Sequence, residues 1–203
     1  MLFRKFVLPG LVVAVASAFL VASATAQNTL KNNDIAISGF AQFTSTATGN
    51  GITDKPSKSG GGAASFRHSY RWWLGYEAGY AYTRYSEFYS GQLFGYQHNM
   101  HDFSGAYYVH GVRAFGIEPF ATAGVSALIF SPSLNGGQKV AWQSRPGLNF
   151  SAGINYPLAT GHFGVRLQYR GVYYKAPDFG NAALATDHFR LTSEPMAGLY
   201  VRF

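Results

Sequence analysis

The stretch Arg145-Pro146-Gly147-Leu148-Asn149-Phe150-Ser151-Ala152-Gly153-Ile154-Asn155-Tyr156 alternates between apolar and small or polar residues. Successive side chains of a β-strand point to opposite faces, so this alternation predicts a strand with two unlike faces. The apolar face carries Leu148, Phe150, Ala152, Ile154 and Tyr156. The other face carries Arg145, Asn149, Ser151, Gly153 and Asn155. A half-buried strand of a soluble protein has the same pattern, so the fold depends on how often the pattern recurs.

The alternation recurs along the chain, whereas helical periodicity is nearly absent after the N-terminal segment. We therefore predict an all-β protein with about eight antiparallel strands. The expected strands are residues 34–46, 63–71, 73–86, 102–113, 117–130, 144–156, 162–174 and 188–203. The phase is ambiguous in two of them, because 63–71 alternates only loosely and Tyr107 and Tyr108 are adjacent within 102–113.

The expected connections alternate in length. Short turns are predicted near residue 72, at 114–116 and at 157–161, and longer polar loops at 47–62, 87–101, 131–143 and 175–187. Short turns at one rim and long loops at the other are typical of a transmembrane antiparallel up-and-down β-barrel. An even number of strands places both termini at the short-turn rim, which we expect to face the periplasm.

The N-terminal segment has the three parts of a secretory signal peptide. Arg4 and Lys5 supply the positive charge, Phe6 to Val21 the apolar region, and Ala24-Thr25-Ala26 a small-x-small cleavage site. We predict a signal peptide at 1–26 and a barrel domain at 27–203. An uncleaved anchor is the alternative, but the apolar run is short for a membrane span.

A soluble β-barrel that binds an apolar ligand would have the reverse orientation, with its apolar face inward. Tyr, Leu, Phe and Ile dominate the apolar face, whereas Gly, Ser and Thr are frequent on the other. A barrel of eight strands is too narrow to enclose the bulky set, which favours a membrane barrel with the apolar face outward. The formal net charge of +7 is spread over single residues rather than basic runs, so nucleic acid is not an expected partner.

The C-terminal residues Ala197, Leu199, Val201 and Phe203 are apolar at alternate positions. This ending resembles the signal that the assembly machinery of outer-membrane barrels reads as a strand. The chain also resembles the OmpA-like small outer-membrane β-barrels in several stretches. These are Trp73-Leu74-Gly75-Tyr76-Glu77-Ala78, Glu118-Pro119-Phe120-Ala121-Thr122-Ala123-Gly124, Phe163-Gly164-Val165-Arg166 and Gly198-Leu199-Tyr200-Val201-Arg202-Phe203. The resemblance implies an eight-stranded barrel with a filled interior in the cell outer membrane, but no particular activity.

Charged residues on the small, polar face are the first candidate site. The strand phases place Arg67, Glu77, Arg145, Arg166, Arg170, Arg190, Glu194 and Arg202 in the lumen. Buried Arg side chains need carboxylate, backbone or water partners, so one interpretation is a paired network that fills the lumen. The other is a narrow pore that prefers anions, because Arg outnumbers Glu on this face.

Aromatic residues form the second candidate group, in two sets. Tyr70, Trp72, Trp73, Tyr156 and Phe163 lie near the short turns, and Tyr82, Tyr85, Phe88, Tyr89, Tyr169 and Tyr173 lie toward the long loops. Two such belts fit the two membrane–water interfaces. Lys55, Lys58, Lys139 and Lys175 fall in the long loops, where they are either solvated or in contact with anionic lipopolysaccharide headgroups.

The segment Gln97-His98-Asn99-Met100-His101-Asp102-Phe103-Ser104 is the third candidate. His98, His101 and Asp102 carry metal-binding groups, and a His with Ser104 is a possible hydrolase pair acting on lipid. Ordinary polar loop residues explain the segment without any function, so we expect no enzyme activity, cofactor or metal site.

The sequence therefore predicts an integral outer-membrane β-barrel, either structural or a narrow porin-like pore. The alternatives are a lipid-modifying hydrolase and a soluble ligand-binding barrel. Outer-membrane lipid, lipopolysaccharide and the barrel assembly machinery are the expected partners.

Overall fold

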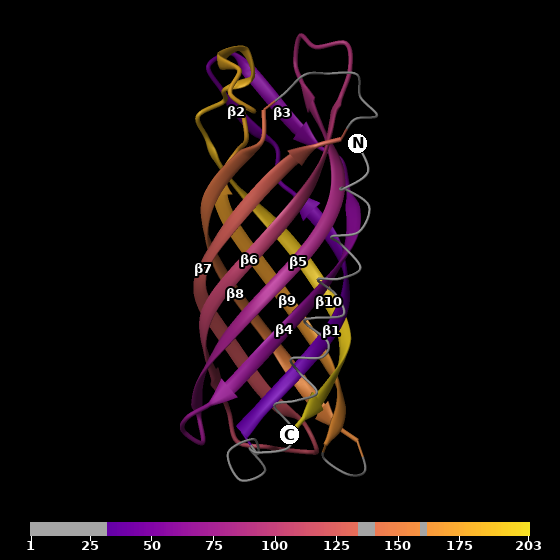
Figure 1. The fold of residues 1–203 in the computed structure, drawn as a ribbon, viewed down its shortest axis with the longest axis vertical. Helices are drawn as coiled ribbons and strands as arrows, with labels where there is room; N and C mark the ends of the chain where they lie inside the picture. The colour runs from indigo at the N-terminus through magenta and orange to yellow at the C-terminus, as the bar shows by residue number, and fades with distance from the viewer. Residues whose placement is uncertain (1–31, 134–140, 159–161) are drawn as a thin grey trace, which may run out of the picture.

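The computed structural model describes residues 32–133, 141–158 and 162–203. Within these ranges the chain forms a closed antiparallel barrel of eight strands, which confirms the predicted fold class (Figure 1). The barrel strands are β1 (Asn33–Thr44), β4 (Ser59–Ser69), β5 (Leu74–Tyr89), β6 (Tyr96–His110), β7 (Glu118–Pro132), β8 (Gln143–Pro157), β9 (Phe163–Lys175) and β10 (Phe189–Arg202). The predicted signal peptide at 1–26 lies outside the described residues.

The barrel closes through β1, which pairs with β4 on one side and with β10 on the other. Ile37 of β1, for example, lies opposite both Ala64 and Leu199. The remaining strands pair with their neighbours in sequence order, from β4 to β10. This is the up-and-down connectivity, which leaves no strand edge unpaired within the barrel wall.

Two barrel strands begin several residues earlier than predicted. β4 includes the glycine run that we expected to be a loop, and Gly61 there leaves room for an aromatic ring: a Cβ on Gly61 would lie 2.4 Å from Cζ of Phe40. β6 begins at Tyr96, so its polar first half is paired strand. A polar sequence can form a strand in this half of β6 if the barrel wall continues beyond the apolar belt on its outer face.

The expected loop 47–62 also contains a small hairpin, formed by β2 (Ala47–Gly49) and β3 (Ile52–Pro56). Asn50 and Gly51 connect these strands, with φ angles of 52° and 75°. Asn-Gly is the preferred sequence for a two-residue hairpin turn, because both residues tolerate positive φ. β3 pairs with the far end of β5, so the hairpin extends the wall there (Figure 1).

The connections differ at the two ends of the barrel as predicted, with one exception: the expected long loop 87–101 is reduced to residues 90–95, because β5 and β6 extend into it. Short turns at 70–73 and 111–117 define the short-turn rim, while the longer connections 45–58 and 176–188 define the long-loop rim. The connection 176–188 includes the 3₁₀ turn η5 (Ala182–Leu184). Asn33 and Phe203 exchange backbone hydrogen bonds of 3.1 and 2.9 Å, so the described N-terminal end and the C-terminus meet at the short-turn rim.

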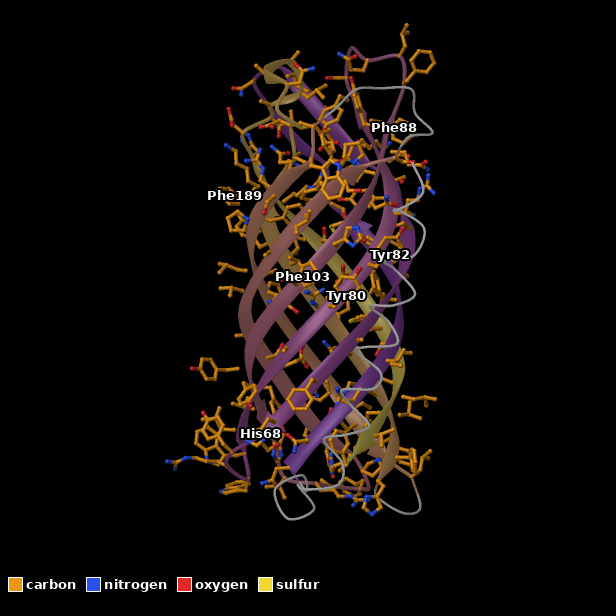
Figure 2. The ribbon with its side chains drawn as sticks, in the orientation of Figure 1. His68, Tyr80, Tyr82, Phe88, Phe103 and Phe189 are labelled. Carbon is orange, nitrogen blue, oxygen red and sulfur yellow. The ribbon has the colours of Figure 1, made fainter. Side chains whose placement is uncertain are left out.

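The outer face of the barrel is apolar. Ile37, Val125 and Leu199 are 70%, 62% and 66% exposed, and Figure 2 shows Phe189 projecting from the side of the barrel. Tyr80, Tyr82 and Phe103 also lie on the outer face, on neighbouring strands β5 and β6 (Figure 2). The charged side chains lie inside, together with small, polar and some aromatic residues, which is the orientation predicted for a membrane barrel.

Among the helical segments that the structure describes, none is long and apolar enough to cross a membrane.

Candidate functional site

Charged side chains form layers inside the barrel, and the first layer lies toward the short-turn rim. Arg67 donates from Nε to Glu77 at 2.5 Å, and Arg166 donates from Nη2 to Asp34 at 2.7 Å. Arg166 also donates to Asn155 at 2.8 Å. Both Arg side chains are almost completely buried, so each guanidinium has exchanged water for a carboxylate partner.

Aromatic rings fill the space around this layer. The Arg67 guanidinium carbon lies 4.0 Å from the ring centroid of Phe120, and the Arg166 carbon lies 5.3 Å from that of Tyr200. A Cβ on Gly164 would lie 2.4 Å from the Tyr200 ring, so the glycine makes room for it. Cation–π contacts therefore stabilise the buried charges where carboxylates do not reach.

The middle layer has one cation and two carboxylates. Arg170 donates to Asp102 at 2.5 Å and to Glu194 at 2.9 Å, and all three side chains are buried. Ser126 accepts a further hydrogen bond from Arg170 at 3.3 Å and one from Asn149 at 3.1 Å. The residues come from β6, β7, β8, β9 and β10, so this layer connects much of the circumference of the barrel.

The third layer lies toward the long-loop rim and is fully buried. Arg190 of β10 donates to Asp54 of β3 at 2.8 Å and to Glu87 of β5 at 2.5 Å. The hydroxyl groups of Tyr85 and Tyr174 each lie 3.2 Å from the same guanidinium. Asp54 belongs to the small hairpin, so this layer ties the hairpin to the barrel wall.

Apolar side chains pack around the third layer and close the mouth at the long-loop rim. Phe179 and Leu184 of the connection 176–188 are buried there, and the Tyr89 hydroxyl donates to the Pro177 carbonyl at 2.8 Å. The cluster consists of Tyr85, Tyr89, Met100, Leu128, Phe130, Val172, Tyr174, Phe179 and Leu184. The connection 176–188 thus folds inward over the lumen.

Two cavities show how far solvent space extends. A cavity of about 540 Å³ opens at the short-turn rim, between Tyr108, Glu118 and Arg202. A second, of about 30 Å³, lies between the first and middle layers, beside Ser65, Gln168 and Arg170. The second cavity is large enough to hold water. Beyond it, Asp54, Glu87 and Arg190 have 0% exposed side chains, so no water-filled channel touches the third layer.

The structure places six of the eight predicted lumen residues in these layers. Arg67 and Glu77 pair with each other, Arg170 pairs with Glu194, and Arg166 and Arg190 have partners that the sequence analysis did not name. The other two lie at the rims. Arg202 pairs with Glu118 at 2.8 Å near the short turns, and Arg145 pairs with Asp178 at 2.7 Å near the long loops.

The predicted lumen, in which Arg outnumbers Glu, suggested an excess of positive charge, and this is wrong because Asp residues also line the interior. The three layers contain four arginines and six carboxylates: Arg67, Arg166, Arg170, Arg190, Asp34, Asp54, Glu77, Glu87, Asp102 and Glu194. Asp54 and Glu87 were missed because both fell in predicted loops, and Asp102 because its strand was ambiguous in phase. The Asn50-Gly51 turn signal could have revealed the hairpin that carries Asp54.

The candidate residues of the His98–Ser104 segment are divided between the two faces of β6. His98 and Asp102 face the interior, whereas His101 faces outward and accepts from or donates to the Tyr80 hydroxyl at 2.9 Å. The ring of His98 packs edge-on against Tyr85 at 4.3 Å between centroids. Within the described residues, no group of three metal-ligating side chains converges.

The aromatic belt toward the long loops is smaller than predicted. Tyr82, Phe88, Tyr169 and Tyr173 are on the outer face, but Tyr85 and Tyr89 are only 2% and 3% exposed and belong to the interior cluster. Tyr85 and Tyr89 are separated from Glu77 by even numbers of residues along β5, so their side chains point to the same, inward face. The alternation also resolves the adjacent tyrosines of β6, because Tyr107 is 67% exposed and Tyr108 is 6% exposed.

Asp178 anchors the connection 176–188 at the long-loop rim. It accepts hydrogen bonds from the Gly180 backbone N–H at 3.0 Å, from Gln143 at 2.6 Å and from Arg145 at 2.7 Å. Partial burial raises the pKa of Asp178, but the donors from Gly180, Gln143 and Arg145 outweigh burial, so its pKa lies below its ordinary value. The carboxylate is therefore the stable form, and it holds the connection over the lumen.

Comparison with known proteins identifies the fold. No protein-family model and no curated protein matches the chain. Similar solved structures include the outer membrane protein OprG from Pseudomonas aeruginosa, with 14% identity and a TM-score of 0.61 over 87% of this chain and 98% of that one. Neisserial surface protein A has 16% identity and a TM-score of 0.61, covering 84% and 97%.

A third similar structure is Ail, the attachment invasion locus protein of Yersinia pestis, in complex with the heparin analogue sucrose octasulfate. It has 17% identity and a TM-score of 0.51, covering 85% of this chain and 99% of that one. Together these likenesses establish that the chain has the fold of small outer-membrane barrels.

Proposed function

We propose that the chain is an integral outer-membrane β-barrel with an occluded lumen, which acts as a rigid scaffold for the surface at its long-loop rim. The observation that carries this proposal is the combination of an apolar outer face with a buried, ion-paired interior. Water is a poor solvent for so large an exposed apolar belt, whereas lipid hydrocarbon accommodates it. The layers inside make the barrel stiff without requiring a ligand.

The orientation of the barrel in the membrane and its family relationship are also part of the proposed function. Ala197, Leu199 and Val201 lie on the outer face of β10, where assembly machinery has access to an apolar strand face before closure. We infer that these residues and Phe203 form the assembly signal, that the short-turn rim faces the periplasm, and that the chain is related to the OmpA-like barrels. Lipid and lipopolysaccharide are the partners that the outer face would contact.

A narrow pore is the second candidate, and the cavity at the short-turn rim is the observation that favours it. That cavity opens a path only as far as the first layer. Conduction would then require the buried Arg170 and Arg190 layers to separate. If Arg170 or Arg190 moved away, the two carboxylates that it bridges would remain buried without a cation between them. That arrangement is energetically unfavourable. The occluded scaffold is therefore the better-supported function.

Single-channel recording in a planar bilayer tests the choice between scaffold and pore. The refolded chain, with folding verified by a heat-dependent shift in gel mobility, is expected to give no discrete conductance steps. A known porin in the same bilayer calibrates detection. Regular conductance steps from the folded protein would refute the occluded lumen and favour the pore.

A further inference from the structure

The charges of the chain are segregated between the inside and the outside of the barrel. The sequence contains nine Asp and Glu residues, and each has a cationic partner within ion-pair distance. Seven cations are enough to pair them all, since Arg170 and Arg190 each contact two carboxylates. Within the described residues, five cations have no carboxylate partner: Lys55, Lys58, Arg71, Arg84 and Arg113.

Three of these cations lie near the long-loop rim, on β3, between β3 and β4, and on β5, and we call them the Arg84 patch: Lys55, Lys58 and Arg84. All three are exposed. Lys55 lies opposite Phe88 in the β3–β5 pairing, and Lys58 follows Ser57, which bonds to Ser86 of β5. The patch therefore spans one side of the outer wall.

Aromatic side chains border the patch, which places it at the edge of the apolar belt. Phe88 is 51% exposed and lies nearer the long-loop rim than Tyr82 (Figure 2). The Lys58 ammonium lies 5.8 Å from the centroid of the Phe43 ring, which is also on the outer face. Aromatic rings of this kind occupy the membrane–water interface, so the three cations are at the depth of lipid headgroups.

Arg84 is held in a fixed position by neutral partners. Its Nη2 donates to Gln97 at 2.7 Å and to Ser133 at 2.6 Å. These contacts orient the guanidinium but do not neutralise it. Among the described residues, Nη1 and Nε of Arg84 have no acceptor, so their N–H groups are left to donate single hydrogen bonds to phosphate oxygens.

We propose that the Arg84 patch binds the phosphate groups of anionic lipid headgroups in the membrane leaflet next to the long-loop rim. This inference rests on the proposed function, because it requires the apolar belt to be in a membrane. The unpaired positive charge of the patch attracts an anionic lipid surface, and the aromatic rings beside it suit the boundary between headgroups and hydrocarbon. The patch follows the side wall of β3, β4 and β5, where headgroups of neighbouring lipids reach it.

The test uses the full mature chain in nanodiscs of phosphatidylcholine with increasing phosphatidylglycerol. The chain has no cysteine, so Ser86→Cys on β5 can carry a trifluoromethyl tag whose ¹⁹F shift reports locally on the patch. We expect saturable titration by phosphatidylglycerol. Arg84→Gln should raise the half-saturating fraction by about fivefold, and the triple variant with Lys55→Gln and Lys58→Gln should raise it further.

Two matched variants separate specific binding from general charge. Arg84→Lys keeps the charge but loses the guanidinium that Gln97 and Ser133 hold in place, so its effect should lie between wild type and Arg84→Gln. Arg113→Gln removes an unpaired cation at the opposite rim and should leave the titration unchanged.

Three results would overturn the proposal. If the folded and inserted triple variant has the same half-saturating phosphatidylglycerol fraction as wild type, the patch does not bind phosphate. The proposed membrane insertion would not be affected by that result. Sucrose octasulfate, a soluble polyanion, is added to the same nanodiscs in a separate titration. If it changes the ¹⁹F shift of the tag and phosphatidylglycerol does not, the partner is a soluble polyanion rather than lipid. If the chain does not insert into any bilayer, the proposed function fails and this inference fails with it.

Discussion

Arg190 joins three separate parts of the molecule, because β10 supplies the guanidinium, β3 supplies Asp54 and β5 supplies Glu87. Arg190→Met would fill a similar volume but leave two carboxylates buried without their cation. Removing one partner of a buried ion pair typically costs about 3–5 kcal/mol. We expect a loss of that order in the free energy of unfolding, measured by urea titration in lipid vesicles.

The exposed pair Lys175–Asp187 is the matched control for Arg190. Its side chains are 36% and 56% exposed, and their oxygen–nitrogen distance is 2.6 Å. Solvent screening leaves such exposed pairs little net effect on stability, so Lys175→Met should change stability little. Equal losses in Lys175→Met and Arg190→Met would show that burial of the third layer contributes nothing.

Single residues also show which parts of the site the sequence could predict. Strand alternation was sufficient to predict that Arg166, Arg170 and Arg190 face inward, because side-chain direction follows from local phase. Their partners were not predictable in the same way. Asp34 pairs with Arg166 across 132 positions of the chain, a contact that depends on barrel closure and register rather than on local pattern.

At the scale of elements, the connection 176–188 should loosen at acidic pH. Asp178 has a pKa below its ordinary value of 3.8, so it contributes stability that is fully present above pH 3.8. That contribution is lost as the pH falls through the lower, folded-state pKa. We expect amide hydrogen exchange in residues 176–188 to accelerate over this acid range.

The variant Asp178→Asn provides the control for this acid effect. It cannot titrate, so its exchange in residues 176–188 should be faster than wild type at neutral pH and nearly independent of pH in the acid range. Wild-type exchange that stays flat below pH 3.8, after correction for the intrinsic rate, would contradict the role of Asp178.

Glycines that face the interior set how closely the strands and rings approach. A Cβ on Gly164 of β9 would lie 2.4 Å from the Tyr200 ring, so Gly164→Ala must displace that ring within a packed interior. Overpacking of this kind costs about 1–3 kcal/mol. We expect a corresponding drop in the urea midpoint of the vesicle-embedded protein.

Gly105 of β6 is the control position, since a Cβ there would meet nothing within 4 Å. Gly105→Ala should change stability by less than about 0.5 kcal/mol. If both alanine variants behave alike, the close approach of Tyr200 to β9 is not a constraint on the fold.

Among the elements, strands were predicted better than connections. All eight barrel strands overlap their predicted ranges, because the alternation that lines both faces is a local signal. The β2–β3 hairpin and the polar beginning of β6 were predicted as loops, since polar composition alone favours loops. Their pairing depends on a neighbouring strand that extends beyond the apolar belt.

For the whole molecule, the distribution of side-chain size over the two faces was the informative property. Most of the bulky apolar residues lie outside because a barrel of eight strands is too narrow for all of them, while the inward face encloses the charges and a smaller set of apolar and aromatic side chains. The function of the interior was less predictable. An apparent excess of Arg suggested a pore for anions, whereas the assembled barrel brings in Asp34, Asp54, Glu87 and Asp102 as additional buried partners.

In a membrane, the apolar face of the barrel should contact lipid and the polar face should line a filled interior. We would test it with a spin-label scan of β8 in bilayers, from Leu148 to Asn155, one Cys variant at a time. Labels at Leu148, Phe150 and Ile154 should be accessible to oxygen dissolved in lipid, whereas labels at Asn149, Ser151 and Asn155 should be immobile and inaccessible to both oxygen and a water-soluble relaxant. Accessibility in the opposite phase, or access of the water-soluble relaxant to the Leu148 face, would contradict the account.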